Sequence, residues 1–378
     1  MAISLKESLV VGFTDFWSRK IRSFVTIIGI VLGTMSIIVV LSLVNGINKK
    51  SLEWMMERGG LARITVQRNW EFTEDTSEKR YFTLKEFYLI RSLLPEALYF
   101  SAEVREWFQA AFQDKKYWTG VYGVLPDFSD VEEWDVESGR FLNEFDLREA
   151  NDVICIGSQV KEELFGNKNP LGEYITVSNR RLQVIGVMEH RFLKGNSTFG
   201  NENALAYLNR RAYTPISTMI HKITSNDVIN SISLKARTVE EAPELRQHLE
   251  AVILNLRNGQ PVFSIESAQE EAVEMEKNAQ RFQVIFFLIS TISLLVGGIV
   301  IMNIMLASIQ ERTREIGIRI TVGARRRDIF LQFMVQTVLV TTIGGIFGII
   351  LGLSLLDVVG KFLDFELVAG GYMILIAL

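Results

Sequence analysis

One charged segment of this sequence combines residue types that can bind the surface of a partner protein. Residues 310–328 contain six arginines and three acids, with Ile316, Ile318 and Ile320 among these charges. Arginine pairs with carboxylates through planar, forked hydrogen bonds, while acids and apolar side chains add other kinds of contact. In a helix that begins near Gln310, acids four residues apart share one face. The pattern therefore favours a docking helix.

An anchor bound to anionic lipid is the simpler interpretation of the same segment. Each basic residue near an anionic membrane surface contributes about 1 kcal/mol to such binding. An anchor uses neither the acids nor the exposed isoleucines, whereas a docking helix uses all three residue types. We therefore prefer protein docking and keep membrane lipid as a further partner.

The other residues that could do chemistry are isolated from one another. Residues 166–173 contain glycines but lack the Lys and hydroxyl of a phosphate-binding loop. Cys155 lies alone in an apolar strand, which favours a buried structural thiol, and one cysteine cannot form a disulfide within the chain. The three histidines have no metal-ligand spacing. We expect a protein that is not an enzyme and holds no metal, cofactor or nucleic acid.

Long uncharged runs flank the charged segment, and each is long enough to cross a membrane. Residues 282–310 and 329–356 contain 29 and 28 residues without a charge, and residues 23–48 contain 26. About 20 helical residues span a bilayer core. Residues 367–378 are also apolar, and we interpret them as the start of a fourth span. Asn303 is the most polar residue inside these runs, so the spans lack the carboxylate or His of an ion-coupled pump.

The charge of the short segments predicts their sides of the membrane. Residues 1–22 carry a net charge of +2, residues 310–328 carry +3 and residues 357–366 carry −2. Basic segments stay in the cytoplasm, which leaves residues 49–281 outside. The predicted organisation is a cytoplasmic amphipathic helix (1–22), a first span (23–48), an extracytoplasmic domain with stalk helices (49–281), a second span (282–309), the cytoplasmic segment (310–328), a third span (329–356), a short outer loop (357–366) and the start of a fourth span (367–378).

Small residues recur at every fourth position of the predicted spans. Such spacing lets helix backbones approach closely, either within one subunit or between two copies. These residues are Gly29 and Gly33 in the first span, Ser293 and Gly297 in the second, and Gly344, Gly348 and Gly352 in the third.

The outer block mixes strand and helix patterns, so we expect an α+β domain. Residues 63–67 alternate as a strand, and Thr83 opens a helix with a capping-box pattern. We place a boundary between two lobes near residues 117–127. Residues 265–283 are rich in Glu and free of Gly and Pro, which predicts a stalk helix that continues into the second span. Residues 43–56 could extend the first span in the same way.

Several motifs resemble the MacB/FtsX-type ABC transporter permeases. The charged segment carries E-R-T-R-E-I-G-I-R at residues 311–319, and residues 21–33 are similar to the first span of that family. In the outer block, the resemblance to the MacB-like periplasmic core rests on Gly139-Arg-Phe141, Asp146, Ile156-Gly-Ser158, Glu163-Leu-Phe-Gly166, Asn169-Pro-Leu-Gly172 and Val184-Ile-Gly-Val187.

The resemblance implies a homodimer or heterodimer of four-span subunits in the bacterial inner membrane, working with an ABC ATPase that binds ATP and Mg²⁺. Because the chain starts at the amphipathic helix, it implies a separate ATPase subunit. Its motion would reach the outer domain through the stalks, a mechanism called mechanotransmission. Residues 320 and 321 are Ile-Thr where relatives usually have Lys-Ala. The implied ATPase-coupling residues are Glu311, Arg312, Thr313, Arg314, Glu315, Ile316, Gly317, Ile318 and Arg319.

Two functions fit this resemblance. The first is a permease subunit that exports a small molecule or peptide or extracts a lipoprotein, with a periplasmic adaptor or a lipoprotein carrier as an additional partner. The alternative is an FtsX-like signalling subunit that regulates a cell-wall hydrolase. The size of the outer domain favours the first.

Overall fold

The computed structural model describes residues 20–73, 78–193 and 203–363. The chain divides into two compact units. One comprises residues 1–49 and 276–378, and the other comprises residues 50–275. Residues 1–19 of the amphipathic helix predicted at residues 1–22, and the predicted fourth span, lie outside the described residues.

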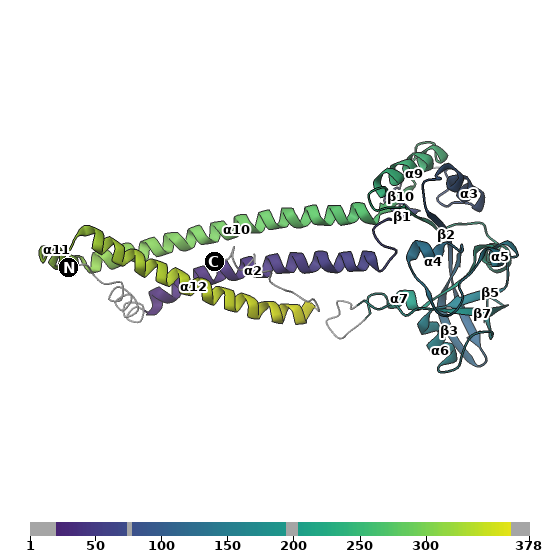
Figure 1. The fold of residues 1–378 in the computed structure, drawn as a ribbon, viewed down its shortest axis with the longest axis horizontal. Coiled ribbons are helices and arrows are strands. Elements are labelled where there is room, and N and C mark those ends of the chain that lie inside the picture. Colours follow the sequence, from purple (N-terminus) through teal and green to yellow (C-terminus); the bar gives the residue numbers. More distant parts are fainter. Residues whose placement is uncertain (1–19, 74–77, 194–202, 364–378) are drawn as a thin grey trace. The chain divides into compact units, whose positions relative to one another are not determined.

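The first unit contains long helices joined at one end by a short one. Helix α2 (Lys20–Met56) enters this unit, α10 (Ala268–Glu311) leads to α11 (Thr313–Thr321), and α12 (Arg326–Leu363) follows. Figure 1 shows α11 at the end where α10 and α12 meet. Within the described residues, three helical segments are long and apolar enough to cross a membrane: Ile27–Met56, Ala268–Glu311 and Arg326–Lys361.

Close packing between α2 and α12 explains the small residues in the third apolar helix. Ile37, Ile38, Ile349 and Leu356 form a small buried cluster between the two helices. A Cβ atom added to Gly352 would lie 3.5 Å from Ile38 Cβ. The opposite surfaces remain apolar and exposed, which is typical of helices that face lipid or a second membrane helix.

The structure extends two predicted helices and shortens a predicted loop. Helix α2 continues to Met56 without a break, as expected for a stalk, although Asn45 and Gly46 are poor helix formers. Helix α12 continues to Leu363. Residues 357–363 are therefore helical, although we assigned them to a loop, and Lys361 Nζ bonds Asp357 Oδ2 at 2.8 Å across one helical turn.

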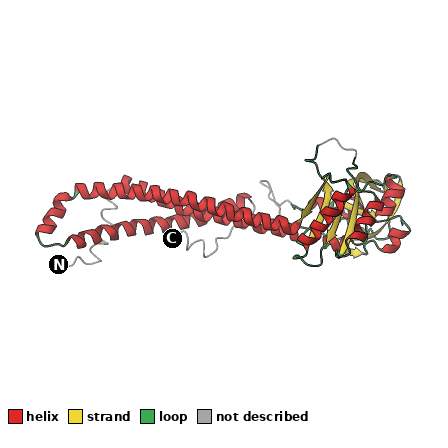
Figure 2. Ribbon diagram, turned by 90° about the horizontal axis from the view of Figure 1, so that it is seen from above, coloured by secondary structure: helices red, strands yellow, loops and turns green. Residues whose placement is uncertain are grey.

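The second unit is built on one mixed, ten-stranded sheet (Figure 2). Its path is β10-β1-β9-β2-β3-β8-β5-β7-β4, and β6 pairs with β2 and β7. The β3–β8 and β5–β7 pairs are parallel. The strands are β1 (Arg63–Arg68), β2 (Tyr99–Phe112), β3 (Lys115–Val124), β4 (Val136–Gly139), β5 (Val153–Ile156), β6 (Tyr174–Val177), β7 (Arg180–Met188), β8 (Arg211–Pro215), β9 (Ser231–Lys235) and β10 (Phe263–Ser267).

Short helices cover the sheet and close its two hydrophobic clusters. The larger cluster joins β1, β2 and β9 to helices α3, α6 and α9, and the smaller one surrounds Tyr213 with Tyr122, Phe128 and Trp134. The helices of this unit are α3 (Leu84–Leu93), α4 (Phe128–Glu132), α5 (Glu144–Arg148), α6 (Ser158–Phe165), α7 (Ala206–Asn209), α8 (Ile216–Thr218), the π-helix η1 (Met219–Thr224) and α9 (Ala242–Leu256).

Several predicted elements of the outer block are confirmed. Strand β1 occupies the position predicted from residues 63–67. Thr83 caps α3 because its side chain accepts a hydrogen bond from the backbone N–H of Glu86, while Glu86 Oε2 accepts one from the Thr83 N–H at 2.8 Å. This reciprocal capping satisfies two N–H groups that the helix leaves without partners.

The predicted lobe boundary is wrong, and one predicted helix begins later than expected. Residues 117–124 belong to β3, which lies in the middle of the sheet. The change of partner occurs within β2 instead, where Glu103 pairs with β9 and Val104 pairs with β3. Residues 263–267 form strand β10, so the stalk helix starts at Ala268. Long-range strand pairing determines both features, β10 with β1 in one case and β2 with β9 and β3 in the other, and local sequence patterns do not report it.

Candidate functional site

The charged segment forms a short helix that is set off from its neighbours at both ends. Helix α10 stops at Glu311, where the Thr313 hydroxyl donates to the carbonyls of Ile309 and Gln310 at 3.1 and 2.8 Å. Glu311 therefore ends one helix and Glu315 lies in the first turn of the next, so our expectation that they share a face of one helix is wrong. Side-chain bonding of this kind competes with helical backbone bonding.

The C-terminal end of α11 is closed by a glycine. Gly323 has a φ of +108°, and the N–H groups of Gly323 and Ala324 donate to the carbonyls of Ile320 and Arg319. This is the Schellman arrangement, in which a left-handed residue satisfies the last helical carbonyls. Arg325, Arg326 and Arg327 consequently stand at the start of α12, and the Arg325 N–H approaches Asp328 Oδ2 at 3.4 Å.

The surface of α11 presents both charges and apolar side chains. None of its residues is buried. The side chains of Ile318 and Ile320 are 57% and 42% exposed, and Val322 beyond the helix is 83% exposed. Arg314 and Glu315 are exposed as well. Exposed apolar side chains beside charged ones are typical of surfaces that contact another molecule.

A hydrogen bond connects α11 to the following membrane helix. Arg319 Nη1 donates to Gln332 Oε1 at 3.0 Å, from α11 to α12. Gly317 has no atom within 4 Å of the position that a Cβ would occupy. Glu311 and Arg312 are engaged in interactions at the end of α10. The nine predicted coupling residues thus divide between the end of α10 and the exposed helix α11.

A groove between α2 and α10 collects the small residues of the first two apolar helices. It has a volume of about 560 Å³. A Cβ on Gly29 would lie 3.9 Å from Gly297 Cα, and one on Gly33 would lie 3.6 Å from Leu294 Cδ2. The groove is lined by Gly29, Leu32, Gly33, Met35, Ser36, Ile289, Ile292, Ser293, Val296, Gly297 and Val300.

The glycines of α12 have a different position. A Cβ on Gly344 would lie 3.1 Å from Ile30, and a Cβ on Gly348 would overlap the hydroxyl of Thr34. These glycines face α2 of the same chain, whereas Ser293 and Gly297 border the groove. The sequence left both roles open for all seven small residues.

The outer-domain motifs that carried the family resemblance hold the chain together. Gly139 has a φ of +84°, and a Cβ on Gly186 would lie 2.3 Å from the carbonyl oxygen of Arg140. Asp146 is buried and accepts from Arg140 Nη1 and Nη2 at 2.5 and 3.2 Å, and from Asn151 Nδ2 at 3.1 Å. Burial raises the pKa of Asp146, but these hydrogen bonds outweigh burial and hold the pKa below its usual value.

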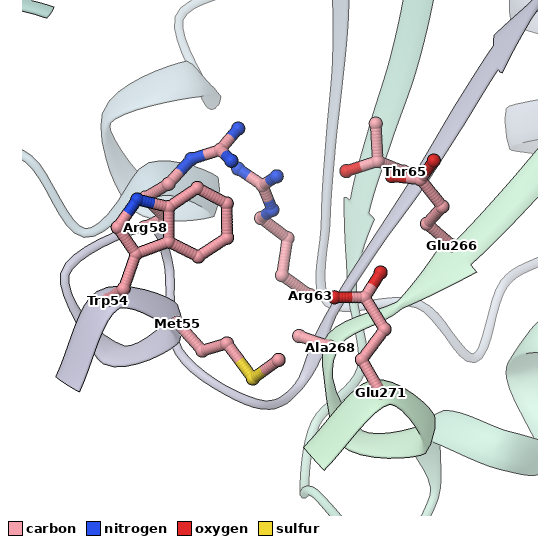
Figure 3. A pocket seen from close by; sticks show the side chains of 8 residues that line it. All are labelled: Trp54, Met55, Arg58, Arg63, Thr65, Glu266, Ala268 and Glu271. Carbon is pink, nitrogen blue, oxygen red and sulfur yellow. The ribbon is translucent and has the colours of Figure 1, made fainter. Parts of the chain in front are cut away.

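A small polar pocket of the outer domain was not expected from the sequence. Its volume is about 50 Å³, enough for a few water molecules. Figure 3 shows the side chains of Arg58 and Trp54 together, and the guanidinium carbon lies 4.4 Å from the centre of the indole ring. Burial and the nearby charge of Glu266 raise the pKa of Glu271, against the effect of Arg63 and Arg58. The pocket residues come from distant parts of the sequence, so no local sequence pattern predicts the pocket.

The isolated cysteine and histidines lie in separate places. Cys155 is fully buried, and burial raises the pKa of its thiol well above the ordinary value. His190 Nδ1 and the Ser158 hydroxyl are 2.8 Å apart, and His248 Nδ1 lies 3.0 Å from Glu96 Oε1. The thiol is thus a packing element, because a reactive cysteine needs an accessible thiolate.

Comparison with known families matches both units of the chain. Residues 23–252 match the MacB-like periplasmic core domain, and residues 287–377 match the FtsX-like permease C-terminal domain. The macrolide export ATP-binding/permease protein MacB of Neisseria gonorrhoeae is 33% identical over 340 residues, which cover 89% of this chain and 50% of that protein. The MacB of Bdellovibrio bacteriovorus is 28% identical over 380 residues, covering 98% of this chain and 57% of that protein.

A solved structure is also similar to part of the chain. The periplasmic region of MacB from Actinobacillus actinomycetemcomitans aligns with a TM-score of 0.49 and 21% identity, over 60% of this chain and 98% of that one. The chain spans about half the length of the curated relatives that it matches, and it corresponds to their permease part. With an extracytoplasmic core domain and apolar membrane helices, the chain belongs to the MacB/FtsX-type family of ABC transporter permeases.

Proposed function

We propose that this chain is the permease of an ABC transporter of the bacterial inner membrane. In this proposal, α11 docks on an ABC ATPase, which binds ATP and Mg²⁺. The observation that carries the proposal is the exposed surface of α11, where Ile318 and Ile320 stand beside Arg314 and Glu315 between two apolar helices. Arginine is one of the residue types that contribute most to binding in protein interfaces.

The long helices provide a route for movement from the docking helix to the outer domain. Helix α10 begins directly after β10, at Ala268, and runs for 44 residues to Glu311. Helix α2 runs for 37 residues and ends shortly before β1. Each helix therefore joins an apolar segment to the sheet of the outer domain, and β1 and β10 are paired strands. We infer that ATP-driven movement of α11 reaches these strands through α10.

The outer domain acts on the transported molecule in this proposal. The match to the MacB-like core supports export of a small molecule or peptide, or extraction of a lipoprotein, over an FtsX-like signalling role. The relatives are named as macrolide exporters, and macrolides are one candidate substrate. A periplasmic adaptor or lipoprotein carrier would then receive the cargo.

A second copy of a permease subunit is the proposed occupant of the groove between α2 and α10. Helix backbones approach closely where small residues line a membrane helix. Gly29, Gly33 and Gly297 contribute no side chains to the apolar lining of the groove. The proposed dimer would present two docking helices, one for each of two ATPase subunits or domains. Twofold symmetry is the commonest arrangement of soluble oligomers.

Charge reversal on α11 tests the docking assignment. The variant Arg314→Glu with Glu315→Lys keeps the net charge, and we expect it to abolish co-purification with the ATPase and the stimulation of ATP hydrolysis. Membrane insertion should persist, because neither side chain is buried. The matched control reverses another exposed pair, Asp357→Lys with Lys361→Glu on α12. Unchanged co-purification of the α11 variant would overturn the proposal.

A further inference from the structure

An asparagine amide stands without a partner on the exposed surface of α10. Asn303 is exposed, and within the described part of the chain its side chain makes no hydrogen bond. Two hydroxyls of the same helix differ, because each bonds to a carbonyl one turn back. Thr291 Oγ1 donates to the Phe287 carbonyl at 2.8 Å, and Ser293 Oγ donates to the Ile289 carbonyl at 3.0 Å. The amide of Asn303 is therefore available to a partner outside its own helix.

The position of Asn303 along α10 makes such a partner important. Asn303 lies eight residues before Glu311, the nearest charge in the sequence, and 22 residues after Arg281. With a rise of about 1.5 Å per residue, Glu311 is about 12 Å away along the helix axis, which places the amide inside a hydrocarbon core about 30 Å thick. Lipid tails offer no hydrogen bonds, so an amide at this depth favours contact with another protein segment.

Asn303 continues the face of α10 that lines the groove between α2 and α10. Ile289 and Val296 line this groove, and Asn303 follows them at the same spacing of seven residues. Seven residues make nearly two helical turns, so each step rotates the side chain by only about 20° about the helix axis. Val300, another lining residue, lies about one turn before Asn303. A helix that packs along this face of α10 therefore reaches both the groove and the amide.

We propose that Asn303 pairs with the same residue of a second copy of this chain, the copy that would occupy the groove. This contact rests on the proposed dimer and adds the hydrogen bonds that set its register. An amide carries an acceptor oxygen and N–H donors, so two facing amides can each donate to the other. A contact between identical residues requires a twofold axis beside Asn303.

A second copy is the partner that fits this amide best. Both copies cross the membrane at the same level, so the second one brings a matching amide to the same depth. A helix of different sequence would need a polar side chain of its own at that depth. A single asparagine in an apolar helix seam also fixes register and subunit number in coiled coils.

The strength of association tests the amide pair. Full chains labelled at the amino terminus with a donor or an acceptor fluorophore are mixed in phosphatidylcholine vesicles, and energy transfer is measured as added lipid dilutes them. We expect Asn303→Leu to weaken association by about three- to thirtyfold, the range for hydrogen bonds between membrane helices. Asn303→Gln keeps an amide and should retain most of the association.

A matched control is available on the same helix. Thr291 lies two residues after Ile289, about 200° around the helix and thus opposite the groove. Its hydroxyl is already bonded within α10. We therefore expect Thr291→Val to leave association unchanged.

Disulfide formation identifies the partner residue. If identical residues meet at a twofold axis, Asn303→Cys should give disulfide-linked dimers when copper phenanthroline, an oxidant that enters the bilayer, is added. Thr291→Cys should remain monomeric. The parent chain measures the background, because its one cysteine, Cys155, is buried.

The contrary outcomes separate this contact from the dimer itself. If Asn303→Leu associates as tightly as the parent chain, or if Asn303→Cys does not cross-link, the amide pair is overturned and the groove dimer stands. An Asn303→Gln chain that associates no better than Asn303→Leu would show that the amide is not the contact. Parent chains that stay monomeric in the vesicles would overturn both proposals. No ATPase takes part in these measurements, so every outcome leaves the docking role of α11 intact.

Discussion

Gly348 on α12 packs directly against Thr34 on α2. A Cβ built on Gly348 would lie 1.7 Å from Thr34 Oγ1 and 3.0 Å from the Val31 carbonyl oxygen. Thr34 Oγ1 is itself bonded to the carbonyl of Ile30 at 3.0 Å, so it has little freedom to move away. The close packing of the two membrane helices at this point therefore depends on the absence of a side chain at residue 348.

Gly348→Ala should separate α2 from α12 and destabilise the membrane unit. Overpacking of this kind costs about 1–3 kcal/mol. The measurement is the thermal unfolding midpoint of the purified chain in detergent. Gly345→Ala is the control, since no atom lies within 4 Å of the added Cβ. Adding Thr34→Ala to Gly348→Ala should restore part of the lost stability. Equal unfolding midpoints for Gly348→Ala and Gly345→Ala would contradict this packing.

Cysteine cross-linking should detect a second copy of the subunit at the groove. The chain has one cysteine, Cys155, which is buried. A cysteine added at an exposed described position is therefore the one that an oxidant can reach. We expect Ser293→Cys to form a disulfide-linked dimer in membranes under mild oxidation. Ser354→Cys, an exposed serine of α12 away from the groove, should remain monomeric. Cross-linking at Ser354 without cross-linking at Ser293 would place the interface elsewhere.

Ile318→Ser should weaken ATPase docking without unfolding the chain. The side chain is 57% exposed in the structure, so its truncation leaves no cavity, whereas burial of such a side chain in an interface contributes about 1.5–3 kcal/mol. The measurement is the permease concentration that gives half-maximal ATPase stimulation, which we expect to rise about tenfold or more. Leu93→Ser on α3, exposed to 52%, removes similar apolar surface from the outer domain. An unchanged concentration would exclude Ile318 from the interface.

Asp146 should make the stability of the outer domain depend on acid. Because its pKa is below the unfolded value, its contribution is complete above pH of about 3.9 and is lost as the pH falls through the folded pKa. We expect Asp146→Asn to cost about 1–2 kcal/mol at pH 7, since the Arg140 side chain is 48% exposed and solvent weakens the pair. The difference from the parent chain should shrink in acid below that pH. A constant difference across this range would show that the charge is unimportant.

The sequence by itself determined the membrane segments and the local elements of the outer domain. Uncharged runs longer than a bilayer core predict apolar helices regardless of their neighbours, and the structure contains three of them in its described part. The capping box at Thr83 is equally local, because its donor and acceptor lie three residues apart. The E-R-T-R-E-I-G-I-R motif also predicted where an exposed, charged helix would stand between two apolar ones.

Only the tertiary structure decided how distant segments pair. Strand β2 changes its partner after Glu103, and β10 pairs with β1 from about two hundred residues away in the chain, as Ile64 opposite Ser267 illustrates. The sequence could not distinguish glycines that face α2 from small residues that line a groove, since both have the same spacing. Spacing along a chain fixes local hydrogen bonds, whereas the partners across a sheet or between helices are chosen by the burial of the whole domain.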